Sequence, residues 1–537
     1  MKRGATGMVI WQCGEDPVVG FAARELARCL RRMTAQPARV RKAPPGRPPE
    51  TGIVVGLPAS ADAASCGADC PADRWEDRLL IRSAGGRLIL TGSNPRSVLF
   101  AVYRWLEQLG ARWIRPGRDG ELLPPIRPPV LSGWEVDETA SCRHRGIVIE
   151  GANAIEQVLD LVDWMPKAGM NAYMLQFRVS AYFWRRYYER TDLPSIRDPH
   201  LLSIEECAAL DDRVAAAVRQ RGLLLHRVGH GWTCSAMGFP EVAGWETAPE
   251  PPDSIRPLLA EVKGRRGWFG GAPINTDLCY GNPEARRRFV DTVTAYAAAH
   301  PGIDVLHVWL SDGMNNMCEC PLCAEKQPTD WYVTLLNEIS PRLLAAAPRM
   351  KLAALCYSNT MWPPTTVAPD RLGDNVILMF APISRCYGHA ILDPRCTAEP
   401  PPVPYTRNAV TTPRANGDYA AMLRAWQRYL PPGIDAFAFD YPLWMNFPNE
   451  WLGMDAAALF AEEVGQYRGA GVNGILSCQL QRAFVPTSLG QHALAHWLWN
   501  CKAPLAPFVD RFFVDAFGSE GSIARDFYHA FTAANGP

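Results

Sequence analysis

The chain has 537 residues, more than a single hydrophobic core usually organises, so two or three domains are expected. Lys plus Arg and Asp plus Glu are balanced at 55 each, and this neutrality argues against a nucleic-acid partner or an acidic membrane surface. The 16 cysteines show no repeated spacing, which excludes a disulfide-stapled scaffold.

The N-terminal segment MKRGATGMVIWQCGE lacks the apolar run of a secretory signal. No later stretch reaches the roughly 18 uninterrupted apolar residues of a membrane span. We therefore expect a cytoplasmic protein with mostly reduced thiols and no membrane partner. The oligomeric state is left open.

Residues 1–130 alternate strand and helix patterns and are expected to form a small α+β domain. The predicted elements are strands at 8–12 and 53–55, a helix at 21–33 and a hairpin at 79–91. The run SNPRSVLFAVYRWLEQLG is typical of a helix that Ser93 or Asn94 caps and Gly110 ends. The proline-rich stretch 116–129 is expected to be the linker out of this domain.

From about residue 140 the pattern changes to a repeated strand, polar turn and helix. Eight strands are predicted, at 146–149, 171–177, 223–228, 305–310, 351–356, 376–380, 436–439 and 472–476. Intervening helical patterns favour right-handed βαβ units that close into a (β/α)₈ barrel over residues 140–485. An open doubly wound sheet is the alternative, disfavoured because no glycine-rich phosphate turn follows a strand. Residues 486–537 are expected to form a mainly helical C-terminal extension.

The most informative stretch is IDVLHVWLSDGMNNMCECPLC, residues 303–323, in which a buried strand runs into a polar turn. Barrels hold their active sites at the carboxyl ends of their strands, so Asp312 is the first catalytic candidate. We expect it to be a general acid/base whose pKa is raised by partial burial. Asp440, after the seventh strand, is favoured as a second carboxylate that would work with Asp312, and Glu150, after the first, is the alternative.

Polar and aromatic side chains follow the other predicted strand ends. Arginines, amides and aromatic rings together are the chemistry of a carbohydrate pocket. The predicted substrate-binding residues are Arg178, His230, Trp232, Asn315, Asn316, Tyr357, Arg385, Tyr387, Tyr441, Trp444, Gln479 and Arg482. The long segment 231–281 after the third strand is expected to be a functional lid or subdomain.

Three cysteines, Cys318, Cys320 and Cys323, are as closely spaced in the sequence as the thiolate ligands of a metal site. With a fourth Cys or His they would form a tetrahedral structural zinc site, and free thiols bracing a loop are the alternative. The fourth ligand would come from elsewhere, such as Cys279, Cys356 or Cys386. No cofactor is expected to be required for catalysis.

Several segments resemble known families. The run LILTGSNPRSVLFAVYRWLEQLGARW is similar to the accessory domain that precedes the barrel in family 20 hexosaminidases and α-glucuronidases. Six further segments resemble the bacterial family labelled domain of unknown function 4838: RHRGIVIEGA, DWMPKAGMNAYMLQF, RVGHGWT, INTDLCYGNPE, HVWLSDGMNNMCECPLC and SCQLQRAFVPT. That family includes glycoside hydrolase family 163, which contains endo-β-N-acetylglucosaminidases. The resemblance covers roughly residues 80–490 and implies a glycosidase-like barrel.

A similarity to family 20 suggests roles for the residues that follow the fourth predicted barrel strand. That family has a His-Ile-Gly-Gly-Asp-Glu strand end, and HVWLSD can be laid on it by its leading His307. This places Asp312 where the acid/base Glu stands and Ser311 where the Asp stands that orients a substrate acetamido group. Ser311 therefore departs from the substrate-assisted mechanism of that family.

These observations together predict a glycoside hydrolase that acts on an oligosaccharide, with N-acetylhexosamine or uronate units, by a two-carboxylate mechanism. One alternative is a carbohydrate-binding barrel without turnover, because a fold does not imply an activity. The other is a lyase or epimerase acting on a uronate sugar, which would use Arg385, Tyr387 and Arg482. The sugar, the linkage and the stereochemistry are left open.

Overall fold

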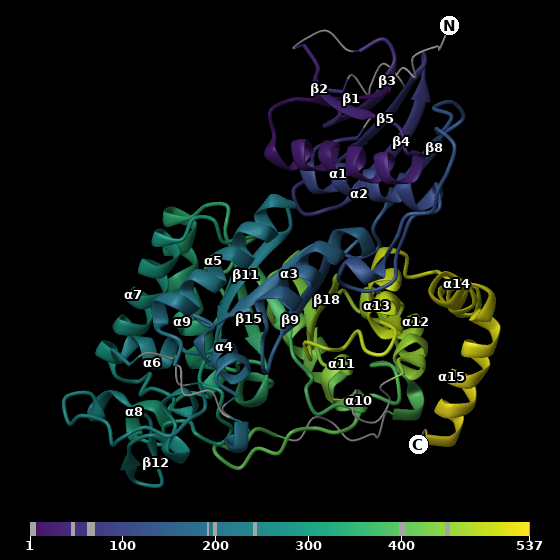
Figure 1. Cartoon of the computed structure of the whole chain (residues 1–537). Coiled ribbons are helices and arrows are strands. Elements are labelled where there is room, and N and C mark those ends of the chain that lie inside the picture. Colours follow the sequence, from purple (N-terminus) through teal and green to yellow (C-terminus); the bar gives the residue numbers. More distant parts are fainter. Residues whose placement is uncertain are drawn as a thin grey trace, which may run out of the picture.

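The computed structural model describes residues 7–44, 49–61, 70–190, 193–196, 201–239, 244–396, 404–445 and 452–535. Three parts follow one another along the chain: an N-terminal α+β region, a closed barrel and a group of C-terminal helices (Figure 1). The predicted fold class is confirmed. No helix within these ranges combines the length and the hydrophobicity needed to cross a lipid bilayer.

The N-terminal region is built on a six-stranded sheet in the order β2-β1-β3-β5-β4-β8. Its strands are β1 (Met8–Cys13), β2 (Ala38–Lys42), β3 (Gly52–Gly56), β4 (Arg78–Ala84), β5 (Arg87–Gly92) and β8 (Glu135–Thr139). Helices α1 (Pro17–Thr34) and α2 (Pro95–Gln108) lie between this sheet and the barrel (Figure 1). The predicted hairpin is the antiparallel pair β4 and β5.

Both outer strands of this sheet, β2 and β8, are absent from the sequence prediction. They are rich in charged residues and largely exposed, as edge strands often are, so no apolar run marks them. β8 lies beyond residue 130, the expected limit of this region, and it pairs with β4 after the proline-rich stretch.

Eight parallel strands form the closed barrel, and the last, β18, pairs with the first, β9. All eight were predicted, with small differences at their ends. They are β9 (His144–Ile149), β10 (Ala172–Gln176), β11 (Leu224–Gly229), β14 (Val305–Val308), β15 (Lys351–Cys356), β16 (Val376–Phe380), β17 (Asp435–Asp440) and β18 (Gly474–Gln479). Their nearly continuous burial is the pattern of parallel strands that are covered on both faces.

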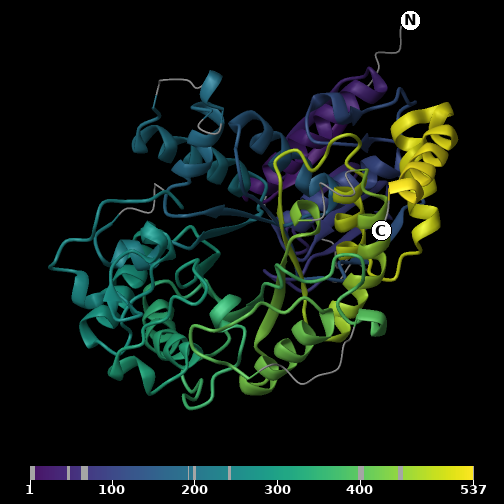
Figure 2. The same ribbon diagram turned by 90° about the horizontal axis from the view of Figure 1, so that it is seen from below.

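Helices surround the barrel (Figure 2). The longer ones are α3 (Ile155–Trp164), α5 (Ile204–Gln220), α7 (Pro283–Ala299), α9 (Pro328–Ala346), α10 (Asn416–Tyr429), α12 (Met454–Gly469) and α13 (Leu489–Trp499). Short helices follow several strand ends: α4 (Ala181–Tyr188), α6 (Trp232–Ala236), α8 (Pro321–Ala324) and α11 (Pro442–Met445). The chain closes with α14 (Leu505–Phe517) and α15 (Gly521–Asn535), which pack on each other at one side of the molecule (Figure 1).

The connection from β11 to α7 is the longest inserted segment, and after α6 it carries the small hairpin of β12 (Glu261–Val262) and β13 (Arg265–Arg266). This hairpin and α8 lie together at the lower end of the molecule in Figure 1. The insertion is the segment expected to be a functional lid or subdomain.

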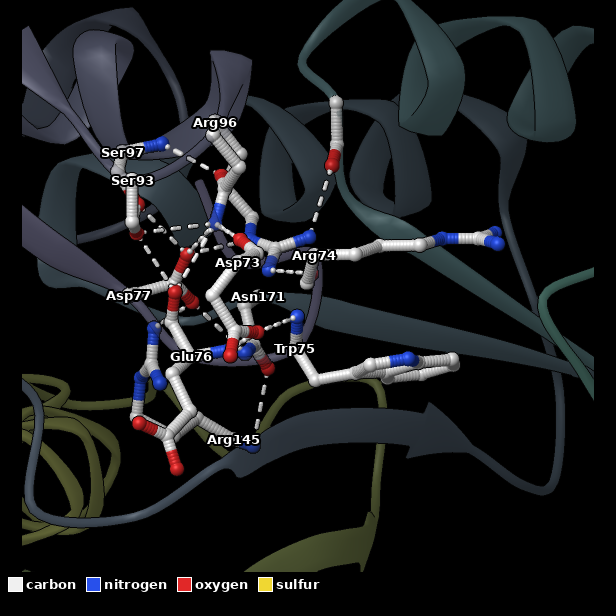
Figure 3. A network of polar contacts seen from close by, with 12 residues as sticks. Asp73, Arg74, Trp75, Glu76, Asp77, Ser93, Arg96, Ser97, Arg145 and Asn171 are labelled. Carbon is white, nitrogen blue, oxygen red and sulfur yellow. Dashed lines mark hydrogen bonds and ion pairs between the residues drawn. The ribbon is translucent and has the colours of Figure 1, made fainter. Parts of the chain in front are cut away.

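A buried ionic network joins the N-terminal region to the barrel (Figure 3). The Asp77 carboxylate, next to β4, accepts hydrogen bonds from Nε of Arg96 on α2 at 2.8 Å and from a terminal nitrogen of Arg145 on β9 at 2.7 Å. Asn171, next to β10, donates to it at 3.0 Å. Burial opposes ionisation here, but the two guanidinium charges hold the pKa of Asp77 well below its usual range. This one carboxylate therefore links two parts of the chain.

Candidate active site

A cavity of about 250 Å³ lies at the carboxyl ends of the barrel strands. Its walls are largely aromatic, and two carboxyl groups face it. The described lining residues are Glu150, Gly151, Gln176, Phe183, Arg186, His230, Trp245, Trp309, Asp312, Leu355, Tyr357, Met379, Ile383, Phe439, Tyr441 and Trp444. This is the mouth at which (β/α)₈ barrels hold their active sites.

Asp312 follows β14 and is held by three hydrogen-bond donors, with 19% of its side chain exposed. One carboxylate oxygen lies 3.1 Å from Nε2 of His230 and accepts a hydrogen bond from the Tyr357 hydroxyl at 3.4 Å. The other accepts from the indole N–H of Trp245 at 2.7 Å. Burial would raise the pKa of Asp312, but the charge of His230 and these three donors lower it. The expectation of a raised pKa is thus corrected, and Asp312 is an ionised carboxylate.

His230 uses both ring nitrogens. Its Nδ1 donates to the carbonyl oxygen of Leu310 at 2.9 Å while Nε2 faces Asp312, an arrangement that suits the doubly protonated ring. Burial alone would lower the pKa of His230, and the Asp312 carboxylate raises it. The preceding backbone is strained, because the β-branched Val228 has a left-handed φ of 81°. Such strain often occurs where a side chain has to be aimed at a functional site.

Glu150 has the opposite electrostatic environment. It directly follows β9, and its backbone N–H donates to the Gln479 carbonyl of β18 at 3.2 Å. Burial, and next the negative charge of Asp312, raise the pKa of Glu150 to about 7, while His230 and the Cys478 thiol act weakly against that shift. Two neighbouring carboxyls whose pKa values are driven apart are the usual arrangement of an acid and a base.

Two buried polar atoms at the cavity have no protein partner among the described residues. They are the indole N–H of Trp309 and the side-chain carbonyl oxygen of Gln176. An unsatisfied buried polar group is costly, by about 1–3 kcal/mol, unless a ligand or water supplies the missing hydrogen bond. Both groups are therefore suited to contact a bound molecule.

The structure brings six of the predicted site residues to this cavity: Glu150, His230, Asp312, Tyr357, Tyr441 and Trp444. The aromatic members offer ring faces on which a sugar can stack.

Asp440 does not belong to this group, although it was the favoured second carboxylate. It is fully buried, and Arg385 donates to its two oxygens at 3.1 and 3.0 Å. Arg385 also pairs with Glu463 of α12 at 2.8 Å, and the Tyr467 hydroxyl donates to Asp440 at 3.0 Å. Asp440 thus ties the barrel to an outer helix, and of the two predicted partners of Asp312 it is Glu150 that lines the cavity.

Two other predicted binding residues belong to the same buried group. Arg385 is enclosed by its two acidic partners, and Tyr387 packs its ring under the Arg385 guanidinium at 4.6 Å. The Tyr387 hydroxyl donates to the Ile383 carbonyl at 2.8 Å. Neither residue lines the cavity.

Six more predicted binding residues also lie off the cavity wall: Arg178, Trp232, Asn315, Asn316, Gln479 and Arg482. Trp232 and Gln479 are fully buried, and Arg482 is exposed at the surface. Arg178 lies over the ring of Tyr296 at 5.6 Å.

Asn315 and Asn316 instead build the turn that follows Asp312. Asn315 exchanges two hydrogen bonds with the backbone of Val410, at 3.0 and 2.8 Å. Asn316 donates to the Asn275 carbonyl and to the Ser311 hydroxyl, each at 2.6 Å. These hydrogen bonds hold the turn that carries Asp312.

Trp245 is the contact of Asp312 that the sequence prediction missed. It lies in the insertion between β11 and α7, where its ring packs against Tyr182, Phe183 and Phe177. The unusual length of this insertion was visible in the sequence, but nothing there singled out one of its tryptophans. Arg186 on α4 is the second polar lining residue that was missed.

A larger cavity, about 750 Å³, lies between the N-terminal region and the C-terminal helices. Its acidic residues are engaged in ion pairs, such as Asp515 with Arg112 at 2.7 Å and Glu138 with Arg104 at 3.0 Å. It borders the amino-terminal ends of β9 and β10, away from the mouth that carries chemistry in this fold. The smaller cavity is therefore the candidate active site.

The predicted cysteine ligands Cys318, Cys320 and Cys323 lie together, and Cys279 joins them. The other two candidates for the fourth ligand lie elsewhere: Cys356 contacts Met361, and Cys386 lies beside His389.

Residues 264–529 match the model of a family described as Domain of unknown function (DUF4838). The match spans just under half of the chain. The resemblance to this family is confirmed for the three quoted segments that lie in this range, INTDLCYGNPE, HVWLSDGMNNMCECPLC and SCQLQRAFVPT. No curated protein is significantly similar in sequence to this chain.

Solved structures with a similar fold are glycoside hydrolases. One is a family GH115 4-O-methyl-α-glucuronidase with specificity for decorated arabinogalactans, with a TM-score of 0.58 and 12% sequence identity. The alignment covers 98% of this chain and 61% of the chain of that enzyme. A GH138 enzyme targeting pectin rhamnogalacturonan II has a TM-score of 0.58 and 11% sequence identity, and the alignment covers 98% of this chain and 69% of that one. A chitobiase of Flavobacterium johnsoniae has a TM-score of 0.54 and 10% sequence identity, and the alignment covers 98% of this chain and 71% of that one. The chain is thus shorter than these proteins, with which it shares a fold.

Proposed function

We propose that the protein is a glycoside hydrolase in which Glu150 is the general acid and Asp312 is the nucleophile or base. The observation that carries the proposal is the pair of carboxyl groups at one small cavity, with the pKa of one raised and that of the other lowered. Cleavage of a glycosidic bond needs one protonated and one ionised carboxyl at the same time. This pair provides both near neutral pH.

In the proposed reaction Glu150 gives its proton to the glycosidic oxygen as the bond to the anomeric carbon breaks. Asp312 either attacks that carbon or takes a proton from the water that does, and the hydroxyl of water ends on the sugar. His230 and Trp245 act as positioning residues, since both hydrogen-bond to Asp312 and keep it ionised and oriented.

The cavity walls support a sugar as the ligand. A volume of about 250 Å³ is suited to a single ring, being just below the roughly 300–1,000 Å³ of drug-sized sites. Trp309 and Gln176 offer a donor and an acceptor to sugar hydroxyls, and aromatic rings offer stacking faces. Two carboxyls at one cavity favour turnover over binding alone.

The charges at the cavity favour an acidic sugar. Among the lining residues that the structure describes, Arg186 and His230 are cationic and, with Glu150 protonated, Asp312 is the one anion. We infer a preference for a uronate over a neutral hexose. A lyase or epimerase is less well supported, because Arg385, Tyr387 and Arg482, which it would use, lie off the cavity wall.

The experiment compares Glu150→Gln with Asp312→Asn on aryl uronides and matched neutral glycosides that carry good or poor leaving groups. Loss of the acid should reduce kcat/KM by about 10²–10⁴-fold for a poor leaving group. For an activated phenol the loss should be small, because that leaving group needs no proton. Asp312→Asn should abolish turnover of both.

Glu156→Gln serves as the control, since Glu156 lies exposed on α3 and should leave the rates unchanged. If Asp312→Asn rather than Glu150→Gln shows the leaving-group dependence, the two roles are reversed. If the wild type binds sugars but turns over no glycoside, the hydrolase proposal is wrong.

A further inference from the structure

We propose that Cys279, Cys318, Cys320 and Cys323 bind one structural zinc ion. All four sulfur atoms lie within 4.8 Å of one another. The Cys279 sulfur is 3.5 Å from that of Cys320 and 3.7 Å from that of Cys323. Zn–S bonds of about 2.3 Å in a tetrahedron place neighbouring sulfurs about 3.8 Å apart. The thiols are therefore already arranged as a tetrahedral site requires.

The composition and burial of the cluster indicate a structural rather than a catalytic ion. The exposed fractions of Cys279, Cys318, Cys320 and Cys323 are 2%, 2%, 5% and 1%. Together with Ala260 and Val262 they form a small cluster separate from the main core. Four thiolates fill the coordination shell of zinc and leave no position for water or substrate. An all-sulfur tetrahedral set suits zinc among the common divalent ions.

The groups around the sulfurs are those that stabilise bound thiolates. The backbone N–H of Gly281 points at the Cys323 sulfur at 3.1 Å, and that of Glu261 at the Cys318 sulfur at 3.3 Å. The Arg266 guanidinium interacts with Cys279 and Cys320. Four thiolates and one Zn²⁺ carry two net negative charges, which these donors and this cation would offset. Four neutral thiols would not need them.

The cluster joins two segments that meet at the active site. Cys279 ends the insertion that also contains Trp245, and the other three cysteines follow the turn that begins at Asp312. A backbone hydrogen bond connects the same two segments, since the Glu319 N–H donates to the Glu261 carbonyl at 2.7 Å. A metal here would fasten the insertion to the loop after β14. Its presence does not depend on the proposed hydrolase activity.

The test is the metal content of the full chain, purified without chelator and measured by inductively coupled plasma mass spectrometry. The expected result is one zinc per chain, released in step with the titration of four thiols by an organomercurial. Cys318→Ser and Cys320→Ser should lower the zinc content at least about tenfold, because each removes one of the four ligands. Cys207→Ser is the matched control, since Cys207 is fully buried on α5 outside the cluster and should leave the zinc content unchanged.

A variant that fails to fold leaves the proposal testable on the wild type. Purified apo protein should take up one Co²⁺ and gain the intense near-ultraviolet absorption of a thiolate–cobalt site. Wild-type protein without zinc whose four thiols react freely and bind no cobalt would overturn the proposal. So would thiols that become titratable only after reduction, since that result would mean two disulfides. Because none of these readouts involves turnover, failure of the hydrolase proposal would leave them unaffected.

Discussion

Two chemically similar carboxyl groups face the cavity and differ in what surrounds them. Asp312 is met by a histidine cation and by two neutral donors, Trp245 and Tyr357, all of which favour its charge. Glu150 meets burial and the negative charge of Asp312 itself, which favour its proton. Ionisation of Asp312 thus helps to keep Glu150 protonated, so the two states depend on each other.

The pH dependence of kcat/KM should reflect this division. Activity should fall as the pH rises through about 7, because Glu150 then loses the proton that the leaving group requires. On the acid side it should fall only below the usual range of an aspartate, because the pKa of Asp312 is lowered and the group must be ionised. Initial rates across the pH range would measure both limbs.

His230→Gln is the informative variant for this profile. Without the histidine cation the pKa of Asp312 should rise, so the acid limb should move to higher pH while the variant remains folded. An acid limb that does not move would show that Asp312 is not the group titrating there.

How far the site could be predicted depended on which way a strand-end side chain points. Glu150, Asp312 and Asp440 give the same signal in the sequence, a carboxyl at or within a few residues of the end of an apolar strand. Only the structure shows that the first two face the cavity and that Asp440 pairs with Arg385. Trp245 stands 67 residues from Asp312, and no local pattern indicates such a contact.

At the scale of one element, the turn after β14 determines where Asp312 lies. A Cβ atom at Gly313 would lie 2.2 Å from the Asn316 amide nitrogen and 2.7 Å from the Asn275 carbonyl oxygen. Both contacts are far too short, so only glycine fits beside the two segments that enclose this turn.

Gly313→Ala should therefore displace the turn and lower kcat/KM at least about tenfold. The overpacking should cost about 1–3 kcal/mol of unfolding free energy while the barrel stays folded. Steady-state kinetics and urea denaturation would measure the two effects. Gly373→Ala is the control, because a Cβ there lies 3.8 Å from its nearest neighbour. Wild-type activity in Gly313→Ala would contradict the assigned role of the turn.

The barrel strands could be predicted because each is an apolar run buried on both faces, as in VILMF of β16. β8 could not be predicted in this way, because its sequence EVDET has no apolar run. The segment is a strand because it pairs with β4. Its position depends on a partner that precedes it by more than 50 residues, as in the pair of Arg82 with Glu135.

At the scale of the whole molecule, the Asp77 network fastens the N-terminal region to the barrel. Asp77→Asn would leave Arg96 and Arg145 buried without their counter-ion. Breaking a buried pair in this way typically costs about 3–5 kcal/mol, so urea unfolding should occur at clearly lower denaturant. Asp137→Asn removes a partly exposed pair with Arg78 and should cost no more than about 1 kcal/mol.

The pH dependence of this loss follows from the lowered pKa of Asp77. A depressed folded-state pKa contributes stability that is present above the usual aspartate range and is lost as the pH falls through the folded value. The difference between wild type and Asp77→Asn should therefore shrink in strong acid. A difference that is the same at every pH would mean that the charge of Asp77 is not what stabilises the junction.

The barrel closes where β18 pairs with β9, and Glu150 lies at that seam, its backbone N–H bound to Gln479. The proposed proton donor is made early in translation, while the strand that fixes its position is the last of the barrel to leave the ribosome. A nascent or truncated chain that ends before Gln479 can carry both carboxyls and still have no assembled active site. The proposed hydrolytic activity should therefore be absent until the barrel is complete.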